Sequence, residues 1–280
     1  MIEIKVPATT ANLGPGYDAM GMALNLYNTF RFSEGEKNYS NDNLIYRSFK
    51  YFYDKYNLEI PEVSIEVDAD VPRSRGLGSS ATCIVAGIMA ANKFSGKNID
   101  KYEILKLATE IEGHPDNVAP AIFGGLITSV VSDEVYIARE NVSDDLSIMI
   151  LVPDFELSTE EARKVVPTNI NIKDAVWNIS RAVLVAKAFS TGDFEMLKAV
   201  SEDKLHEPFR KELINGFNIF ENIVKEYNGT INISGAGPSI LVVCKKENEH
   251  LKVKLKEKAE SLRNWKVLEL KVDNIGSIYK

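Results

Sequence analysis

The sequence contains few of the residues that build metal clusters and disulfide frameworks. Its 280 residues include two cysteines and three histidines. Cys83 and Cys244 lie in apolar runs, so we expect core thiols rather than a disulfide framework. The histidines are far apart in sequence and have no cysteine near them, which argues against a zinc site at His114, His206 or His250.

Long apolar runs and dense basic blocks are also absent. No stretch approaches the roughly 20 apolar residues of a membrane span, and residues 1–6 alternate like a strand rather than showing the basic start and apolar run of a signal peptide. The net charge is −7 and the pI is about 5.2, and acids interleave with the lysines of residues 245–258. We therefore expect a cytoplasmic protein with neither nucleic acid nor a membrane among its partners.

Strand-like and helical patterns are mixed along the whole chain, without a regular strand–helix repeat. The apolar fraction of 45% and the charged fraction of 26% are ordinary for a soluble globular protein. The pattern becomes more helical after Pro153. We predict an α+β protein with a soft boundary there, dividing residues 1–153 from residues 154–280.

A stretch of small residues at positions 72–82 is the most informative part of the sequence. It follows an alternating strand pattern at residues 63–68 and precedes an almost continuously apolar helix pattern at residues 81–94. Glycines let the backbone approach a ligand, serine hydroxyls donate hydrogen bonds, and a helix start offers unpaired N–H groups. We therefore predict an anion-binding loop made of Pro72, Arg73, Ser74, Arg75, Gly76, Leu77, Gly78, Ser79, Ser80, Ala81 and Thr82.

Two better-known phosphate loops are alternatives for this stretch. A Walker A loop needs a lysine where Ser79 and Ser80 stand, so that pattern fails. The dinucleotide fingerprint G-x-G-x-x-G/A fits, but it needs a second strand ending in an acid about 20 residues further on. The chain instead enters another helix pattern at residues 102–111. A plain structural turn is the third possibility that the loop alone leaves open.

Two further loops are built for close backbone approach. The loop at residues 12–18 presents Asn12, which has an acceptor and donors, and Asp18, an acceptor suited to an ammonium group. Alternatively, both side chains only cap turns. The loop at residues 234–239 is a second run of small residues between two strand patterns.

Residues 109–125 combine carboxylates, a histidine and an asparagine. Gly113 and Pro115 are expected to break the preceding helix, so the polar groups would lie on a turn rather than along one helical face. Mg²⁺ takes one or two carboxylates together with phosphate oxygens, and either glutamate of this run could supply one. The polar residues are Glu110, Glu112, His114, Asp116 and Asn117.

Two arginines in the second half lie close to predicted helix ends. Ser158 or Thr159 starts a short helix that carries Arg163. Arg210 lies in a link bent by Pro208. An isolated arginine is usually a surface residue, so these patterns alone assign no role to either.

Three motifs in this order resemble the GHMP superfamily of small-molecule kinases, which contains galactokinase, homoserine kinase, mevalonate kinase and phosphomevalonate kinase. The signature P-x-x-x-G-L-G-S-S-A is matched by residues 72–81 and the late glycine motif by residues 235–239. Residues 7–18, 114–120 and 159–163 are most similar to the homoserine kinase family. The resemblance covers nearly the whole chain.

This resemblance implies a two-lobed fold. The N-terminal lobe would be of the mixed α/β, ribosomal protein S5 domain 2-like type, and the C-terminal lobe a ferredoxin-like α+β domain. The implied activity is ATP-dependent phosphorylation of the side-chain hydroxyl of L-homoserine to O-phospho-L-homoserine, in threonine biosynthesis, with Mg²⁺. The implied partners are ATP and L-homoserine, with a homodimer as an option.

The resemblance also implies roles for particular residues. ATP would be bound by the loop at residues 72–82 and by Asn43, and Mg²⁺ by Glu110 and Ser80, with Glu112 as the alternative glutamate. The ammonium of the substrate would contact Asn12 and Asp18, and its carboxylate Arg163 and Arg210. The remaining implied residues are Asn117 at the reacting hydroxyl, Gly235 and Gly237 at the substrate, and His114, Asp116 and Thr159 in catalytic support.

No residue is an obvious catalytic base, although Asp116 resembles one. Phosphoryl transfer can proceed through a loose transition state, so positioning and charge stabilisation can supply most of the catalysis. A kinase of the same superfamily that acts on a mevalonate-like alcohol or a sugar is the nearest rival, and a non-catalytic nucleotide-binding relative is the other. Two arginines with Asp18 favour a zwitterionic amino acid over a sugar.

Overall fold

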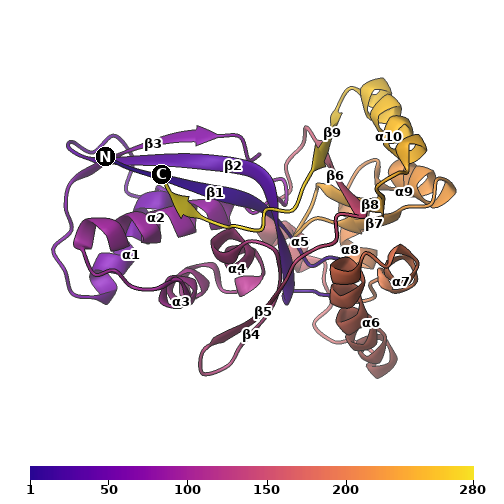
Figure 1. Cartoon of the computed structure of the whole chain (residues 1–280), viewed down its shortest axis with the longest axis horizontal. Helices are drawn as coiled ribbons and strands as arrows, with labels where there is room; N and C mark the ends of the chain where they lie inside the picture. The colour runs from indigo at the N-terminus through magenta and orange to yellow at the C-terminus, as the bar shows by residue number, and fades with distance from the viewer.

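Two antiparallel sheets form the frame of the computed structural model, which describes residues 1–280 (Figure 1). The first sheet has the order β10-β1-β2-β4-β5, and β3 pairs with β2 off this path. Its strands are β1 (Ile2–Ala11), β2 (Met20–Glu34), β3 (Val63–Ala69), β4 (Leu126–Val131), β5 (Val135–Glu140) and β10 (Ile278–Tyr279).

Four helices cover one side of the first sheet (Figure 1). They are α1 (Leu44–Lys55), α2 (Ser79–Ser95), α3 (Lys101–Glu112) and α4 (Pro115–Phe123). Helix α2 packs against α1, α3, α4 and β1 at once, which explains why its sequence is apolar on nearly every side. Phe30 and Phe32 of β2 and Phe49 of α1 are fully buried in this core.

The second sheet has the order β7-β8-β6-β9. Along the chain its strands and main helices alternate as β–α–β–β–α–β, which together with the strand order confirms the ferredoxin-like topology. The strands are β6 (Leu146–Pro153), β7 (Thr230–Ile233), β8 (Ile240–Lys245) and β9 (Trp265–Leu270). The helices are α5 (Thr159–Lys164), α6 (Ile172–Thr191), α7 (Phe194–Val200), α8 (Glu207–Arg210), α9 (Phe217–Glu226) and α10 (Glu249–Leu262), and a 3₁₀ turn spans Lys211–Leu213.

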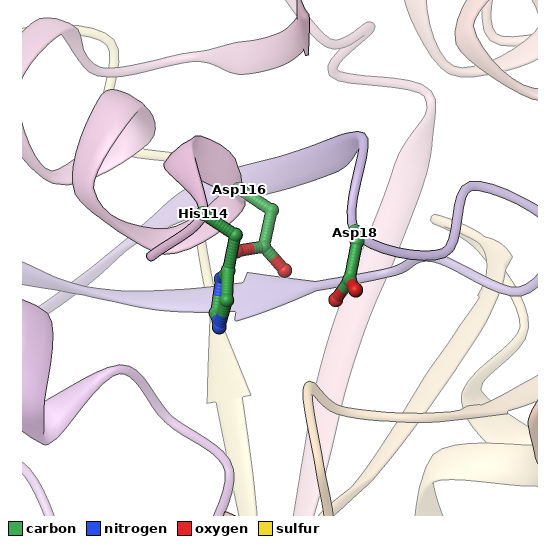
Figure 2. Close-up of side chains that lie close together, drawn as sticks. All are labelled: Asp18, His114 and Asp116. Carbon is green, nitrogen blue, oxygen red and sulfur yellow. The ribbon is translucent and has the colours of Figure 1, made fainter. Parts of the chain in front are cut away.

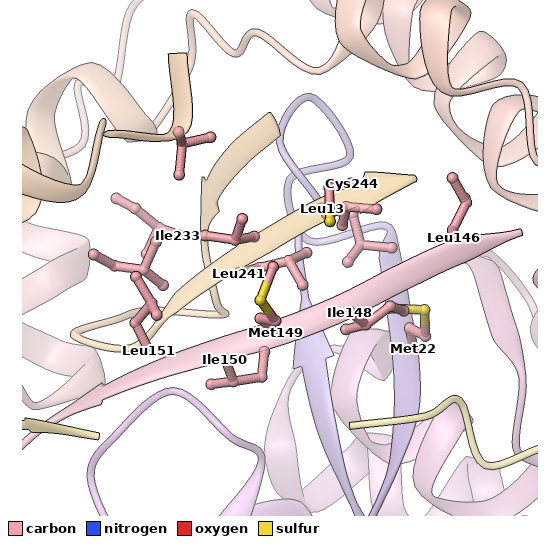
Figure 3. Packing of buried hydrophobic residues seen from close by; sticks show 14 of the residues in the cluster. Leu13, Met22, Leu146, Ile148, Met149, Ile150, Leu151, Ile233, Leu241 and Cys244 are labelled. Carbon is pink, nitrogen blue, oxygen red and sulfur yellow. The ribbon is translucent and has the colours of Figure 1, made fainter. Parts of the chain in front are cut away.

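The two halves share one hydrophobic core rather than meeting at a thin linker. Leu13 and Met22 of the first half pack with Met149 of β6 and Leu241 of β8 in a single buried cluster (Figure 3). This contact fixes the loop at residues 12–18 against the second sheet, which brings residues from both halves to one place.

The predicted boundary at Pro153 needs correction. Strand β6 is one of the two inner strands of the second sheet, so the chain changes sheets between β5 and β6. The C-terminal end also returns to the first sheet, where Ile278 pairs with Lys5. A change of helix content marks neither crossing, because strand pairing depends on contacts between residues far apart in sequence.

Most predicted elements are present within a few residues of their expected bounds, but α4 was missed. Pro115 is the first residue of α4, with His114 as its N-cap. Proline suits that position because its fixed φ is helical and its missing N–H would be unpaired in any case. Asp116 and Asn117 therefore lie in the first turn of a helix, not on a free turn. No helix in the protein is long and apolar enough to cross a bilayer.

Candidate active site

A cleft of about 480 Å³ brings together most of the predicted site residues. Its walls come from the loop after β1, the start of α1, the loop before α2, the junction of α3 and α4, the start of α5, and the loop between β7 and β8. The predicted residues that line it are Asn12, Asp18, Asn43, Arg73, Ser74, Arg75, Gly76, Leu77, Gly78, Ser79, Ser80, His114, Asp116, Asn117, Thr159, Arg163, Arg210, Gly235 and Gly237.

The start of α2 offers unpaired backbone donors to this cleft. Gly78 is the N-cap in a left-handed conformation, with φ +66° and no side-chain cap, so the first N–H groups of the helix have no partner within it. Gly76 is also left-handed, and a Cβ on it would lie 2.2 Å from the carbonyl oxygen of Ser234. The two glycine-rich loops therefore touch, and Ser234 Oγ donates to Gly76 O at 2.7 Å.

Not every residue of the predicted anion loop faces the cleft. Pro72, Ala81 and Thr82 do not line it, and Thr82 Oγ1 is used in hydrogen bonds to Asn28 and Ser79. The side chain of Arg75 donates to the carbonyl oxygens of residues 73, 153 and 154. It therefore ties the loop to the second half of the chain instead of reaching toward a phosphate.

The structure brings Glu112, and not Glu110, to the cleft. Ser80 Oγ donates to Glu112 Oε2 at 3.1 Å, and burial raises the pKa of the Glu112 carboxyl. Glu110 lies outside the cleft, where it pairs with Lys55 at 2.9 Å and with Tyr51. Residues two apart on an α-helix point about 200° apart, so one of the two must face away. The position of the Glu110 side chain therefore does not support the expectation that Glu110 is the metal ligand, whereas Glu112, the alternative glutamate, lines the cleft.

Three titratable side chains that line the cleft lie close together (Figure 2). The ligand atoms of Asp18, His114 and Asp116 all lie within 4.8 Å of one another. His114 Nδ1 contacts Asp116 Oδ1, and Asp116 is 2% exposed. Burial alone would lower the pKa of His114, but the hydrogen bond and charge of Asp116 outweigh it and raise that pKa. This corner favours a positively charged group.

Arg163 and Asp18 form a two-pronged ion pair beside that corner. Arg163 Nη1 and Nη2 donate to the two Asp18 oxygens at 3.0 and 2.9 Å. Arg163 Nη1 also donates to Tyr17 Oη at 3.3 Å. The side chains of Arg163 and Asp18 are 37% and 34% exposed, so solvent and ligands can reach both.

Arg210 is held much more tightly. It is 2% exposed, and its guanidinium donates to Ala162 O at 3.0 Å, to Gly235 O at 3.3 Å and to Tyr17 Oη at 3.3 Å. His206 lies behind it, with Nε2 donating to Gly14 O at 3.0 Å, and its ring stacks on Tyr17. Burial lowers the pKa of His206, which favours the neutral ring.

Buried acids continue this network into the second half. Asp203 accepts three backbone N–H groups and the amide of Asn178. Glu207 accepts from Ile233 N at 2.6 Å, and burial raises its pKa to about 8. Local sequence patterns assign no role to Tyr17, Asp203, His206 or Glu207. Only the position of Tyr17 directly before Asp18 could have drawn attention to it.

Two predicted residues, Asn12 and Asn43, also have structural roles. Asn12 Nδ2 donates to Gly235 O at 2.7 Å, and its Oδ1 accepts from Asp18 N at 2.9 Å. Asn43 caps α1 by accepting from Ile45 N at 2.9 Å. Hydrogen bonds within the protein thus fix the orientation of the Asn12 and Asn43 side chains, and both residues line the cleft.

The chain is similar in sequence to known proteins over nearly its whole length. Residues 43–125 match the family model described as GHMP kinases N terminal domain. The chain is 43% identical to a homoserine kinase of Clostridium beijerinckii over 292 residues, with 99% of this chain and 98% of the relative covered. A homoserine kinase of Clostridium botulinum is 40% identical, with the same shares covered.

A solved structure agrees with these relatives. The crystal structure of homoserine kinase from Cytophaga hutchinsonii matches with a TM-score of 0.88 at 25% identity, covering 100% of this chain and 97% of the other. Identity of 40% and more across nearly the full length of both proteins exceeds what a shared fold alone would give. The chain therefore belongs to the homoserine kinase family of the GHMP kinases.

Proposed function

We propose that the protein transfers the γ-phosphoryl group of ATP to the side-chain hydroxyl of L-homoserine, forming O-phospho-L-homoserine for threonine biosynthesis in the cytoplasm. One observation carries the proposal: the Asp18–Arg163 ion pair and the unpaired helix start of α2 line the same cleft. The first suits a zwitterionic amino acid, and the second suits a phosphate chain.

The phosphates of ATP are assigned to the first turn of α2. Backbone N–H groups from Ser79 onward and the positive end of the helix dipole favour negative charge there. Ser80 and Glu112 supply hydroxyl and carboxylate oxygens, which are the hard ligands that Mg²⁺ prefers. Ser80 and Glu112 would hold Mg²⁺, and its positive charge would offset the negative charge that develops during transfer.

The amino-acid group is assigned to the corner that Asp18 and Arg163 form. In the structure these two side chains neutralise each other at 2.9 Å. A zwitterion can replace that pair, with its ammonium on Asp18 and its carboxylate on Arg163, so no charge is left unpaired. A sugar or a mevalonate-like acid has no ammonium, and binding it would break the ion pair without full replacement.

Catalysis in this cleft rests on positioning. The hydroxyl oxygen attacks the γ-phosphorus, the bond to the bridging oxygen breaks, and its electron pair leaves with ADP. The hydroxyl proton leaves with the transferred phosphoryl group or passes to solvent. No general base is assigned, because a loose transition state does not require early removal of the hydroxyl proton. Asp116 is 2% exposed and its carboxylate contacts His114.

An assay that couples ADP release to a visible signal tests the substrate assignment. We expect L-homoserine to give a kcat/KM at least about 100-fold above those of L-serine, L-threonine and mevalonate, because only L-homoserine combines both charges with a hydroxyl at the right reach. A higher kcat/KM with mevalonate or a sugar would favour the rival superfamily activity. ADP release that no acceptor accelerates would favour a non-catalytic relative.

A further inference from the structure

A buried threonine of β1 connects the phosphate loop to the predicted hydroxyl-binding residue. Thr9 is 0% exposed and does not line the cleft. Its Oγ1 donates to Asn117 Oδ1 at 2.7 Å, across 108 residues of sequence, and its backbone N–H donates to Leu77 O at 3.2 Å. A Cβ on Gly78 would lie 1.9 Å from Thr9 Oγ1. Strand β1, the loop before α2 and helix α4 therefore meet at Thr9.

The Asn117 amide is oriented with its Oδ1 atom toward the Thr9 hydroxyl, and its Nδ2 atom has no partner within the protein. Asn117 lies in the first turn of α4 and lines the cleft. Asn117 therefore presents hydrogen-bond donors to a ligand, while its acceptor is occupied.

We propose that Thr9 is a positioning residue that locks the Asn117 amide with its N–H₂ group toward the reacting hydroxyl. The proposal rests on the proposed function insofar as Asn117 lies at that hydroxyl. One lone pair of the hydroxyl oxygen accepts from Asn117 Nδ2, and the other faces the γ-phosphorus. The O–H bond then points away from Asn117. Asn117 thus aligns the hydroxyl oxygen without accepting its proton.

Thr9 also contacts the loop before α2, so it links the position of Asn117 to that of the phosphate-binding helix start. Its main chain holds Leu77 and its side chain packs on the Cα of Gly78, directly before the helix that cradles the phosphates. The same residue therefore sets the distance between the phosphate-binding helix start and the donor on α4. A shift of about 1 Å in such a distance can cost about 100-fold in rate.

An isosteric pair of variants tests the hydrogen bond. Thr9→Val keeps the shape and removes the hydroxyl, and we expect kcat to fall about 10- to 100-fold with the KM for ATP within about twofold of wild type. Thr9→Ser keeps the hydroxyl, and we expect it to restore kcat to within about threefold. Thr109→Val is the matched control, because Thr109 is 6% exposed and its Oγ1 has no partner. Thermal melting of all variants reports folding.

The assays use whichever acceptor gives wild-type protein its highest rate, so failure of L-homoserine as a substrate counts against the proposed function alone. A Thr9→Val protein with wild-type kcat overturns the role of Thr9, as does an equal loss of kcat in Thr9→Ser. Asn117→Asp gives a second measure should Thr9→Val not fold. It replaces the donor by acceptors and is expected to lose at least as much kcat, whereas near-wild-type kcat in Asn117→Asp overturns the donor assignment.

Discussion

Replacing Glu112 by glutamine lowers kcat by about 100-fold or more, and the concentration of Mg²⁺ that gives half-maximal rate rises. The reason is that a neutral amide is a much weaker ligand for Mg²⁺ than a carboxylate. Glu112 is the carboxylate that lies 3.1 Å from Ser80 in the cleft. The measurement is the steady-state rate across an Mg²⁺ titration at saturating ATP.

Glu110→Gln is the matched control for this prediction, since both glutamates lie near the end of α3. Glu110 pairs with Lys55 and Tyr51 outside the cleft, so its loss is expected to leave the Mg²⁺ dependence unchanged. If Glu110→Gln shifted the Mg²⁺ dependence and Glu112→Gln did not, the metal assignment would be reversed.

Replacing Arg163 by leucine raises the KM for L-homoserine by about 100-fold, while the KM for ATP stays within about twofold. A charged, two-pronged hydrogen bond to a carboxylate is worth about 1.5–3 kcal/mol, and every 1.4 kcal/mol corresponds to a factor of ten. The loss also leaves Asp18 without its partner at 2.9 Å. Initial rates at varied L-homoserine, and separately at varied ATP, give both constants.

Lys164→Leu is the control for charge loss on the same helix. Lys164 is adjacent in sequence but 66% exposed, and it pairs only with Glu160, so its loss should leave both KM values unchanged. Arg163→Lys keeps the charge without the fork and is expected to lie between the leucine variant and wild type. An unchanged L-homoserine KM in Arg163→Leu would contradict the proposed carboxylate contact.

The glycine-rich turn before α2 and the helix start that follows it were predictable from sequence because they depend on local residues. Glycines, serines and a continuously apolar helix stand next to each other at residues 76–94, and those properties do not depend on distant contacts. The start of α5 at Ser158 or Thr159 was predictable for the same reason, and Ser158 is the N-cap.

The choice between Glu110 and Glu112 was not predictable, because it depends on helix phase. Which face of α3 meets the cleft is set by packing against α2 and α4, and a pattern of charges does not encode that rotation. Pro115 misled for a related reason. Proline usually disrupts a helix in its interior but suits the first position. Pro115 is the first residue of α4, and the same helix also accommodates Pro120 in its interior.

The supporting network was beyond prediction because its partners are distant in sequence. Thr9 meets Asn117, and Tyr17 meets Arg163, Arg210 and His206. Each of these side chains is unremarkable in its local sequence. Their roles follow only when β1, α4, α5 and α8 are brought to one cleft.

The central claim is that this cleft phosphorylates the side-chain hydroxyl of L-homoserine. The most direct test is phosphorus NMR of a reaction containing the protein, ATP, Mg²⁺ and L-homoserine. We predict ADP and one new phosphate monoester whose phosphorus couples to the protons of the side-chain CH₂ group. An acyl phosphate on the carboxylate, or inorganic phosphate as the only new phosphorus species besides ADP, would contradict the claim.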